Sequence, residues 1–226
     1  MTSMPANAES ARSAPAPAVA FADMGVARDG QVLLLEATGH LDPGQVLAVT
    51  GPNGCGKTTL LRVVAGITAP TAGQVRVCGR APDDRDRVFR SDLAALIGPP
   101  QTAPELTVRE HLEFIAATWG ADRAVAVTRA DALLAELGIA PLASRYPHEL
   151  SSGQSQLVAV ALTLARPFRV LLLDEPEQRL DPDRLDAVIR AVGFRAEAGA
   201  AVMIATHSPR VRDALADDEL RLEPVA

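Results

Sequence analysis

The sequence predicts an α/β fold with a mostly parallel sheet that helices cover on both faces. Short apolar runs of strand length alternate with runs of helical spacing from residue 19 onward. A glycine-rich turn joins one of these strands, residues 45–50, directly to a helix that starts near Lys57. The 226 residues are 48% apolar, which suffices for one packed domain. Only 3% are aromatic, so Ala, Val and Leu must build the core.

Each expected element is recognised by its apolar pattern and by the residues that end it. The helix that starts near Lys57 ends at Gly66, since glycine commonly terminates helices. Unbroken apolar runs predict strands that are buried on both faces, at 169–173 and 200–206. The other expected elements are a strand at 73–79, a mostly helical region at 108–144, a helix from 153 to about 165 and a helix at 184–194. The helical segment at about 102–150 interrupts the alternation and is therefore expected to be an inserted subdomain.

Bulk properties exclude several classes of protein. Residues 1–17 contain Glu9 and several prolines and have no continuous apolar core, so we expect a disordered extension and not a signal peptide. The longest apolar runs, 157–165 and 170–173, fall far short of the ~20 residues of a membrane-spanning helix. A net charge of −6 argues against nucleic acid as a partner. Two cysteines make no disulfide framework and suit a reducing cytoplasm.

The strongest motif is a phosphate-binding loop. Residues 51–58, GPNGCGKT, match G-x-x-x-x-G-K-[ST] between a strand and a helix. The glycines let successive backbone N–H groups face phosphate oxygens, and the helix N-terminus adds its positive dipole end. Lys57, the only lysine in the chain, is expected to reach the β- and γ-phosphates, and Thr58 to bind Mg²⁺. A chance glycine-rich turn is the alternative, which the register of strand, lysine and helix disfavours. The predicted nucleotide contacts are Gly51, Pro52, Asn53, Gly54, Cys55, Gly56, Lys57, Thr58 and Thr59.

Acidic residues end the buried strand at 169–173. An aspartate at this place in P-loop proteins holds Mg²⁺ or its water, which predicts that role for Asp174. Glu175, the next residue, is placed to polarise the attacking water as a general base. An isolated Asp-Glu pair is more often a solvated turn, but the apolar strand and the phosphate loop favour catalysis. His207 ends the run at 200–206, at the sheet edge where ligands bind, and is a weak signal by itself; Gln101, in a proline-rich turn, has no independent signal.

Five segments in one order resemble the nucleotide-binding subunit of ABC transporters: GPNGCGKTT, IGPPQ, LSSGQ, VLLLDEP and ATHSP. The decisive one is LSSGQ at 150–154, which is similar to the LSGGQ signature that separates this family from other P-loop ATPases and GTPases. The resemblance spans about residues 18–222. It implies a P-loop NTPase core of the RecA-like type, a small N-terminal antiparallel β part and an ABC ATPase domain over 18–226 that contains the inserted helical subdomain.

The resemblance also implies residue roles. Two subunits would pair head to tail around two ATP molecules, with Ser151, Gly153 and Gln154 of one copy facing the phosphate loop of the other. Gln101 corresponds to a switch glutamine that senses Mg²⁺ and the nucleophilic water, and His207 to a histidine that contacts the γ-phosphate. The expected catalytic residues are then Glu175, His207, Gln101 and Lys57, the expected Mg²⁺ residues are Thr58, Gln101 and Asp174, and the cofactors are ATP and Mg²⁺.

The function implied is that of an ATP-hydrolysing subunit that drives transport through separate integral membrane subunits. It would be cytoplasmic, peripheral on the inner face of the cell membrane, and paired with a second copy or a paralogous ATPase subunit. The chain most resembles short stand-alone cassettes of export-type systems. A soluble ABC ATPase not engaged in transport, for example in iron–sulfur cluster assembly, is the alternative. A catalytically inactive binding module is disfavoured because every catalytic group named above is present.

The chain departs from the family pattern at a few positions, none of which removes a catalytic group. Ser152 replaces the first glycine of the signature, and Leu157 and Leu162 stand where the family usually has arginines. The acidic segment continues as EQRLD from Glu177, where the family often reads TSALD or TNGLD. Within the phosphate loop, the thiol of Cys55 lies beside a helix N-terminus and is expected to be reactive and protected by MgATP.

Overall fold

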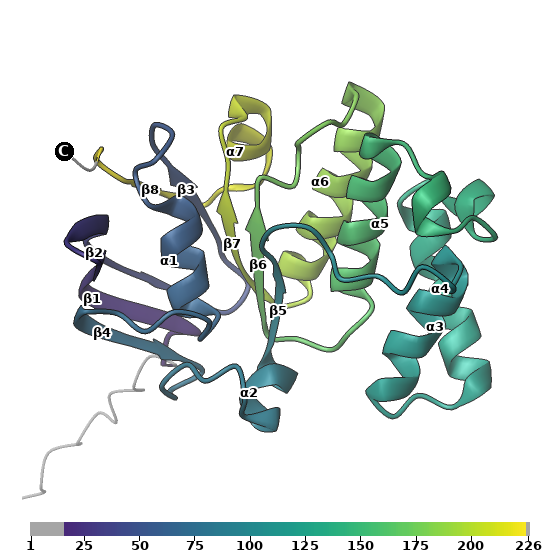
Figure 1. The fold of residues 1–226 in the computed structure, drawn as a ribbon, viewed down its shortest axis with the longest axis horizontal. Helices are drawn as coiled ribbons and strands as arrows, with labels where there is room; N and C mark the ends of the chain where they lie inside the picture. Colours follow the sequence, from purple (N-terminus) through teal and green to yellow (C-terminus); the bar gives the residue numbers. More distant parts are fainter. Residues whose placement is uncertain (1–15, 225–226) are drawn as a thin grey trace, which may run out of the picture.

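The structure, a computed structural model, describes residues 16–224 and contains two sheets (Figure 1). The larger sheet is parallel throughout, in the order β5-β6-β7-β3-β8. The smaller is antiparallel, in the order β2-β1-β4. The mostly parallel sheet and the small antiparallel part are therefore as predicted. The bounds are β1 Val19–Arg28, β2 Gln31–Leu41, β3 Val46–Thr50, β4 Ala72–Val77, β5 Leu93–Leu96, β6 Val170–Asp174, β7 Ala201–Ala205 and β8 Asp218–Arg221.

Helices follow most strands of the parallel sheet, and all of the α-helices in the described chain except α1 begin at a side-chain cap. Thr107 accepts a hydrogen bond from the backbone of Glu110, whose carboxylate in turn binds the backbone of Thr107. Asp122 and Asp181 cap α4 and α6 through their carboxylates alone, each of which accepts from a backbone N–H group of the first turn. The bounds are α1 Lys57–Val64, α2 Arg87–Asp92, α3 Val108–Thr118, α4 Arg123–Glu136, α5 Ser152–Leu164, α6 Pro182–Glu197 and α7 Pro209–Leu215, with short 3₁₀ turns at Ala140–Leu142 and Pro147–Glu149.

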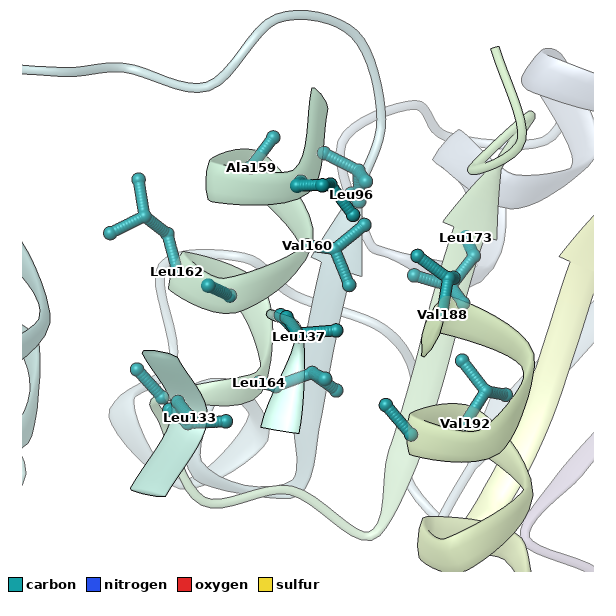
Figure 2. Packing of buried hydrophobic residues seen from close by; sticks show 14 of the residues in the cluster. Leu96, Leu133, Leu137, Ala159, Val160, Leu162, Leu164, Leu173, Val188 and Val192 are labelled. Atoms are coloured by element: carbon teal, nitrogen blue, oxygen red, sulfur yellow. The ribbon is translucent and has the colours of Figure 1, made fainter. Parts of the chain in front are cut away.

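The parallel sheet separates two hydrophobic clusters, because successive side chains of a strand point to opposite faces. In β6, Leu171 and Leu173 enter one cluster, whereas Val170 and Leu172 enter the other. The first cluster packs against α3, α4, α5 and α6, and Figure 2 shows α5 at its centre. The second is covered by the antiparallel sheet and α1. Helices α1 and α5 therefore lie on opposite faces of the parallel sheet.

Helix α5 is apolar around most of its circumference because neighbours cover it on several sides. Leu157 and Leu162 are 2% and 7% exposed and belong to the first cluster. Leucines at these positions therefore extend the core. Ala, Val and Leu dominate both clusters, as the aromatic-poor composition predicts.

Two expectations from the sequence concern the N-terminal extension and the lack of a membrane-spanning helix. The predicted disordered extension, 1–17, lies outside the described residues except for residues 16 and 17, which precede Ala18 and β1. Across residues 16–224, the helices are all too short or too polar to cross a bilayer.

Candidate nucleotide-binding site

The phosphate loop lies between β3 and α1, and its backbone requires glycine. Gly56 has φ of +102°, and a Cβ atom added there would lie 2.7 Å from the carbonyl oxygen of Leu33. Lys57 is only 5% exposed, and its Nζ donates to the carbonyl oxygens of Gly51 at 3.1 Å and Pro52 at 3.2 Å. A buried cation that is held by neutral carbonyls, with no carboxylate partner in the described chain, is well placed to receive an anion.

Thr58 and Asp174 form a pair of oxygen ligands beside this loop. The Thr58 hydroxyl donates to Oδ2 of Asp174 at 2.8 Å, which joins the start of α1 to the end of β6. Burial raises the pKa of the Asp174 carboxyl, and the charge of Glu175 raises it further, while the Thr58 hydrogen bond and Lys57 oppose the shift. A divalent cation would reverse this balance by favouring the carboxylate. Hydroxyl and carboxylate oxygens are the ligands that Mg²⁺ prefers, so the residues present fit that ion.

Glu175 and His207 come together from neighbouring parallel strands. Asp174 pairs with Ala205 across β6 and β7, so the residues that follow each strand meet at the same sheet edge. Oε1 of Glu175 lies 3.3 Å from Nε2 of His207. Glu175 has φ of +49°, an uncommon conformation for glutamate that concentrates at functional sites. The predicted general base and the predicted γ-phosphate contact are thus within hydrogen-bonding distance.

The signature residues form the N-terminus of α5. Ser151 and Gln154 make a reciprocal cap, in which Gln154 accepts from the backbone N–H of Ser151 at 2.9 Å. Among the hydrogen bonds of the described residues, the N–H groups of Ser152 and Gly153 have no acceptor; Ser152 is exposed, whereas Gly153 is buried. Gly153 must be glycine, because an added Cβ would lie 2.6 Å from the carbonyl oxygen of Arg179.

The structure does not bring every predicted residue to one place. The signature belongs to α5 and the phosphate loop to α1, on opposite faces of the parallel sheet (Figure 1). Gln101 is exposed in the segment between β5 and α3, where it lines a cavity against α3 and α5, and it makes no hydrogen bond to another site residue in the described chain. One chain therefore presents two separate half-sites.

Cys55 does not have the exposure that its expected reactivity requires. The residue is 1% exposed and packs in the second hydrophobic cluster. A buried thiol in apolar surroundings is inert, so the expectation from the helix N-terminus alone is not met. The residues at the mouth of the loop are Pro52, Asn53 and Gly54, which are exposed, whereas Thr59 is half-buried.

Three polar side chains at this sheet edge were not predicted from the sequence. Gln178 donates through Nε2 to Oε2 of Glu175. Gln156, on α5, donates to the carbonyl oxygens of Glu175 at 3.4 Å and Pro176 at 3.3 Å. Glu177 accepts three hydrogen bonds from the segment around His207. The departure of EQRLD from the family pattern was a signal for Glu177 and Gln178, whereas nothing in the sequence singled out Gln156.

Known proteins match the chain over most of its length. Residues 34–178 match the family described as ABC transporter. The chain is 39% identical over 183 residues to the lipoprotein-releasing system ATP-binding protein LolD of Maricaulis maris, which covers 78% of this chain and 80% of that protein. A solved ATP-binding subunit of an ABC transporter superposes with a TM-score of 0.81 at 26% identity, over 90% of this chain and 85% of that one. A bacterial ABC transporter cassette solved as a dimer superposes equally well, with a TM-score of 0.81 at 22% identity over 91% and 94%, and shows the fold.

These relatives are transporter subunits, which favours the transporter interpretation over a soluble ATPase of cluster assembly. The phosphate loop, the Thr58–Asp174 pair and the signature at the start of α5 supply the groups that the family match requires. The chain belongs to the ABC transporter family, as one of its ATP-binding subunits that hydrolyse ATP.

Proposed function

We propose that two copies of this cassette close head to tail around two MgATP molecules, and that closing and reopening drive separate membrane-spanning subunits. The observation that carries this is the separation of the half-sites on opposite faces of the parallel sheet. Within one chain, the N-terminus of α5 therefore does not cover the phosphate loop at the start of α1. A second copy related by a two-fold axis supplies each missing half to the other, and such pairing is a general property of isologous dimers. The solved cassette of this fold that is dimeric is a precedent.

We assign binding of the triphosphate to the phosphate loop of one copy and to the signature of the other. Lys57 would exchange its two carbonyl partners for the β- and γ-phosphates, so the buried cation gains an anionic partner. The free N–H groups of Ser152 and Gly153, with the dipole of α5, would bind the γ-phosphate from the other side. The nucleotide itself would therefore join the two copies.

Thr58 and Asp174 would hold Mg²⁺, with Gln101 reaching the same ion when its segment moves inward. When bound, the ion supplies positive charge against the phosphate oxygens. Glu175 would accept the proton of the attacking water, and His207, 3.3 Å from that carboxylate, would contact the γ-phosphate. Gln178 already donates to the second oxygen of Glu175.

The partners follow from the family. An ATP-binding subunit of a transporter works on integral membrane subunits, so the cassette would lie at the inner face of the cell membrane, peripheral and cytoplasmic. Gln101 lines a cavity together with residues of β5, α3 and α5, so it lies against the helical part. A movement of Gln101 on ATP binding would therefore be transmitted to the helical part, which is the route by which hydrolysis would reach a membrane partner.

The test is the variant Glu175→Gln in the full-length chain. Removing the general base should lower kcat for MgATP hydrolysis by about 10²-fold or more while leaving ATP binding intact. Because the two copies then cannot hydrolyse the nucleotide that joins them, MgATP should convert the variant from monomer to dimer in light scattering. The exposed variant Asp84→Asn is the control and should behave as the wild type. A Glu175→Gln chain that binds MgATP and stays monomeric would contradict the proposal.

A further inference from the structure

The carboxyl group of Glu177 ties together the two segments that carry the hydrolytic groups. Glu177 follows Glu175 by two residues in the turn after β6. Its Oε1 accepts a hydrogen bond from the Thr206 hydroxyl and from the backbone N–H groups of His207 at 3.1 Å and Ser208 at 3.3 Å. One oxygen atom therefore holds three consecutive residues of the turn after β7.

This turn has little freedom once Glu177 is in place. Thr206 is 1% exposed, and its Oγ1, while donating to Glu177, also accepts from the N–H of Ser208 at 2.9 Å. The hydroxyl of Ser208 accepts from the N–H of Val211 and caps α7. The backbone N–H of His207 is thus held by Glu177, and the position of its imidazole beside Glu175 depends on that backbone.

The second oxygen of Glu177 indicates that this arrangement is costly. Within residues 16–224, Oε2 is buried and has no hydrogen-bond partner. A buried carboxyl oxygen without a partner opposes folding, so Glu177 stands here at a cost to stability. A side chain that served packing alone would carry no such cost. The family often has a short hydroxyl or amide-bearing segment here, so the carboxylate is a feature of this chain.

The geometry points to Glu177 as a positioning residue for ATP hydrolysis, which acts by holding the His207 turn against Glu175. This inference rests on the proposed roles of Glu175 and His207. In this role Glu177 would contact neither the nucleotide nor the attacking water, because its Oε1 is directed at the turn after β7. Its effect should therefore appear in the rate of the chemical step and not in the binding of ATP, and it should disappear when His207 is absent.

The experiment compares Glu177 variants in steady-state hydrolysis by the full-length chain. Glu177→Ala should lower kcat by about 10- to 100-fold, as a small misplacement of catalytic groups does, and leave KM for ATP within about threefold of the wild type. Glu177→Gln keeps an oxygen that can accept the three bonds and should restore kcat to within about threefold. Glu177→Asp keeps the charge but shortens the reach, and should be as slow as Glu177→Ala.

Two further variants separate positioning from a general loss of structure. Ser208→Ala, in the same turn, removes the cap of α7 but keeps the N–H that Glu177 accepts, so kcat should stay near the wild-type value. In a His207→Ala background, Glu177→Ala should cause no further loss of kcat, because the group it positions is gone. Thermal unfolding of each variant shows that it is folded, and Glu177→Gln and Glu177→Asp keep the comparison available if Glu177→Ala does not fold.

Independent, additive losses for Glu177→Ala and His207→Ala would overturn the inference, as would a normal kcat in Glu177→Ala or a change confined to KM. Failure of the proposed function gives a different result, because MgATP would then fail to produce dimers of Glu175→Gln whatever Glu177 does. An active wild type with a dimeric Glu175→Gln variant and additive losses would leave the proposed function in place and remove only the role of Glu177.

Discussion

Two charged side chains, the buried Lys57 and the half-buried Asp174, face the same site from different elements. Lys57 begins α1 and is held by carbonyl oxygens, whereas Asp174 ends β6 and is held by the Thr58 hydroxyl. The positive charge of Lys57 lowers the pKa of Asp174, but burial outweighs it and the net shift is upward. The carboxylate is therefore destabilised in the folded chain until a cation binds. A site that binds MgATP tightly is expected to carry such an unbalanced charge.

The thermal stability of the variant Asp174→Asn tests whether the Asp174 carboxylate destabilises the folded chain when no cation is bound. A carboxyl whose pKa is raised on folding stabilises the folded state only below its ordinary pKa, and loses that contribution as the pH rises through the folded value. At neutral pH and without Mg²⁺, Asp174→Asn should therefore raise the melting temperature, by about 1–3 °C in a domain of this size. The gain should shrink as the pH falls towards the ordinary range of aspartate.

Thermal unfolding in EDTA between pH 7 and pH 5 is the measurement, and Asp84→Asn, an exposed aspartate, is the control. The same substitution at Asp174 should abolish the stabilisation that the wild type gains from MgATP. A lower melting temperature for Asp174→Asn at neutral pH without Mg²⁺ would show that the carboxylate is already compensated by groups of the protein.

The sequence predicted the residues whose role depends on one motif and missed those whose role depends on folding. Lys57, Thr58, Asp174 and Glu175 stand in local patterns between a strand and a helix, so spacing along the chain locates them. Glu177 acquires its partners only because β6 and β7 are neighbours in the sheet, although α6 lies between them along the chain. The burial of Cys55, which the sequence did not predict, has the same cause, because it depends on the antiparallel sheet that packs over the loop.

At the level of elements, long apolar runs were predictable and short or polar ones were not. β6 and β7 are unbroken apolar strands, and both were located to within a residue. β5 has only the four residues LAAL, which give no period, and the edge strand β8 reads DELR, which is polar enough to resemble a loop. Helix α4 begins at Arg123, before its apolar pattern, because Asp122 caps it there.

The N-terminus of α5 depends on a close approach between two elements, and Gly153→Ala tests it. An added Cβ would lie 2.6 Å from the carbonyl oxygen of Arg179, which is backbone and does not move freely. The α5 N-terminus or the turn before α6 must shift, at a cost of about 1–3 kcal/mol in the free energy of unfolding. MgATP hydrolysis should fall by about 10²-fold, while ATP binding to the phosphate loop on the other face of the sheet should persist.

Chemical denaturation, hydrolysis rates and binding of a fluorescent ATP analogue measure these three effects. Gly193→Ala in α6 is the matched control, because its Cβ would meet only Leu215 at an ordinary 3.5 Å. That helical glycine should give a variant more stable by about 0.5–1 kcal/mol with normal hydrolysis. Full activity in Gly153→Ala would mean that the signature turn tolerates displacement and does not contact the γ-phosphate.

At the scale of the whole molecule, the position of the parallel sheet decides how the site is completed. The sheet lies between α1 and α5, so the phosphate loop and the signature of one chain face different surroundings (Figure 1). Each nucleotide site of a closed pair would then contain the phosphate loop of one copy and the signature of the other. A copy with a defective phosphate loop and a copy with a defective signature should therefore form one intact site between them. A copy that carries both defects should form no intact site with either of them.

Mixing two inactive variants tests this arrangement. Lys57→Ala removes the charge of the phosphate loop, and Gly153→Ala displaces the signature, so each homodimer has two defective sites. In a mixed dimer both defects fall in one site, and the other site has an intact loop and an intact signature. With random pairing, half the dimers are mixed and each has one good site, so an equimolar mixture should recover up to about a quarter of wild-type hydrolysis.

The double variant Lys57→Ala/Gly153→Ala mixed with either single variant forms no intact site and is the control. A mixture that hydrolyses MgATP no faster than its separate components would contradict a site shared between two copies.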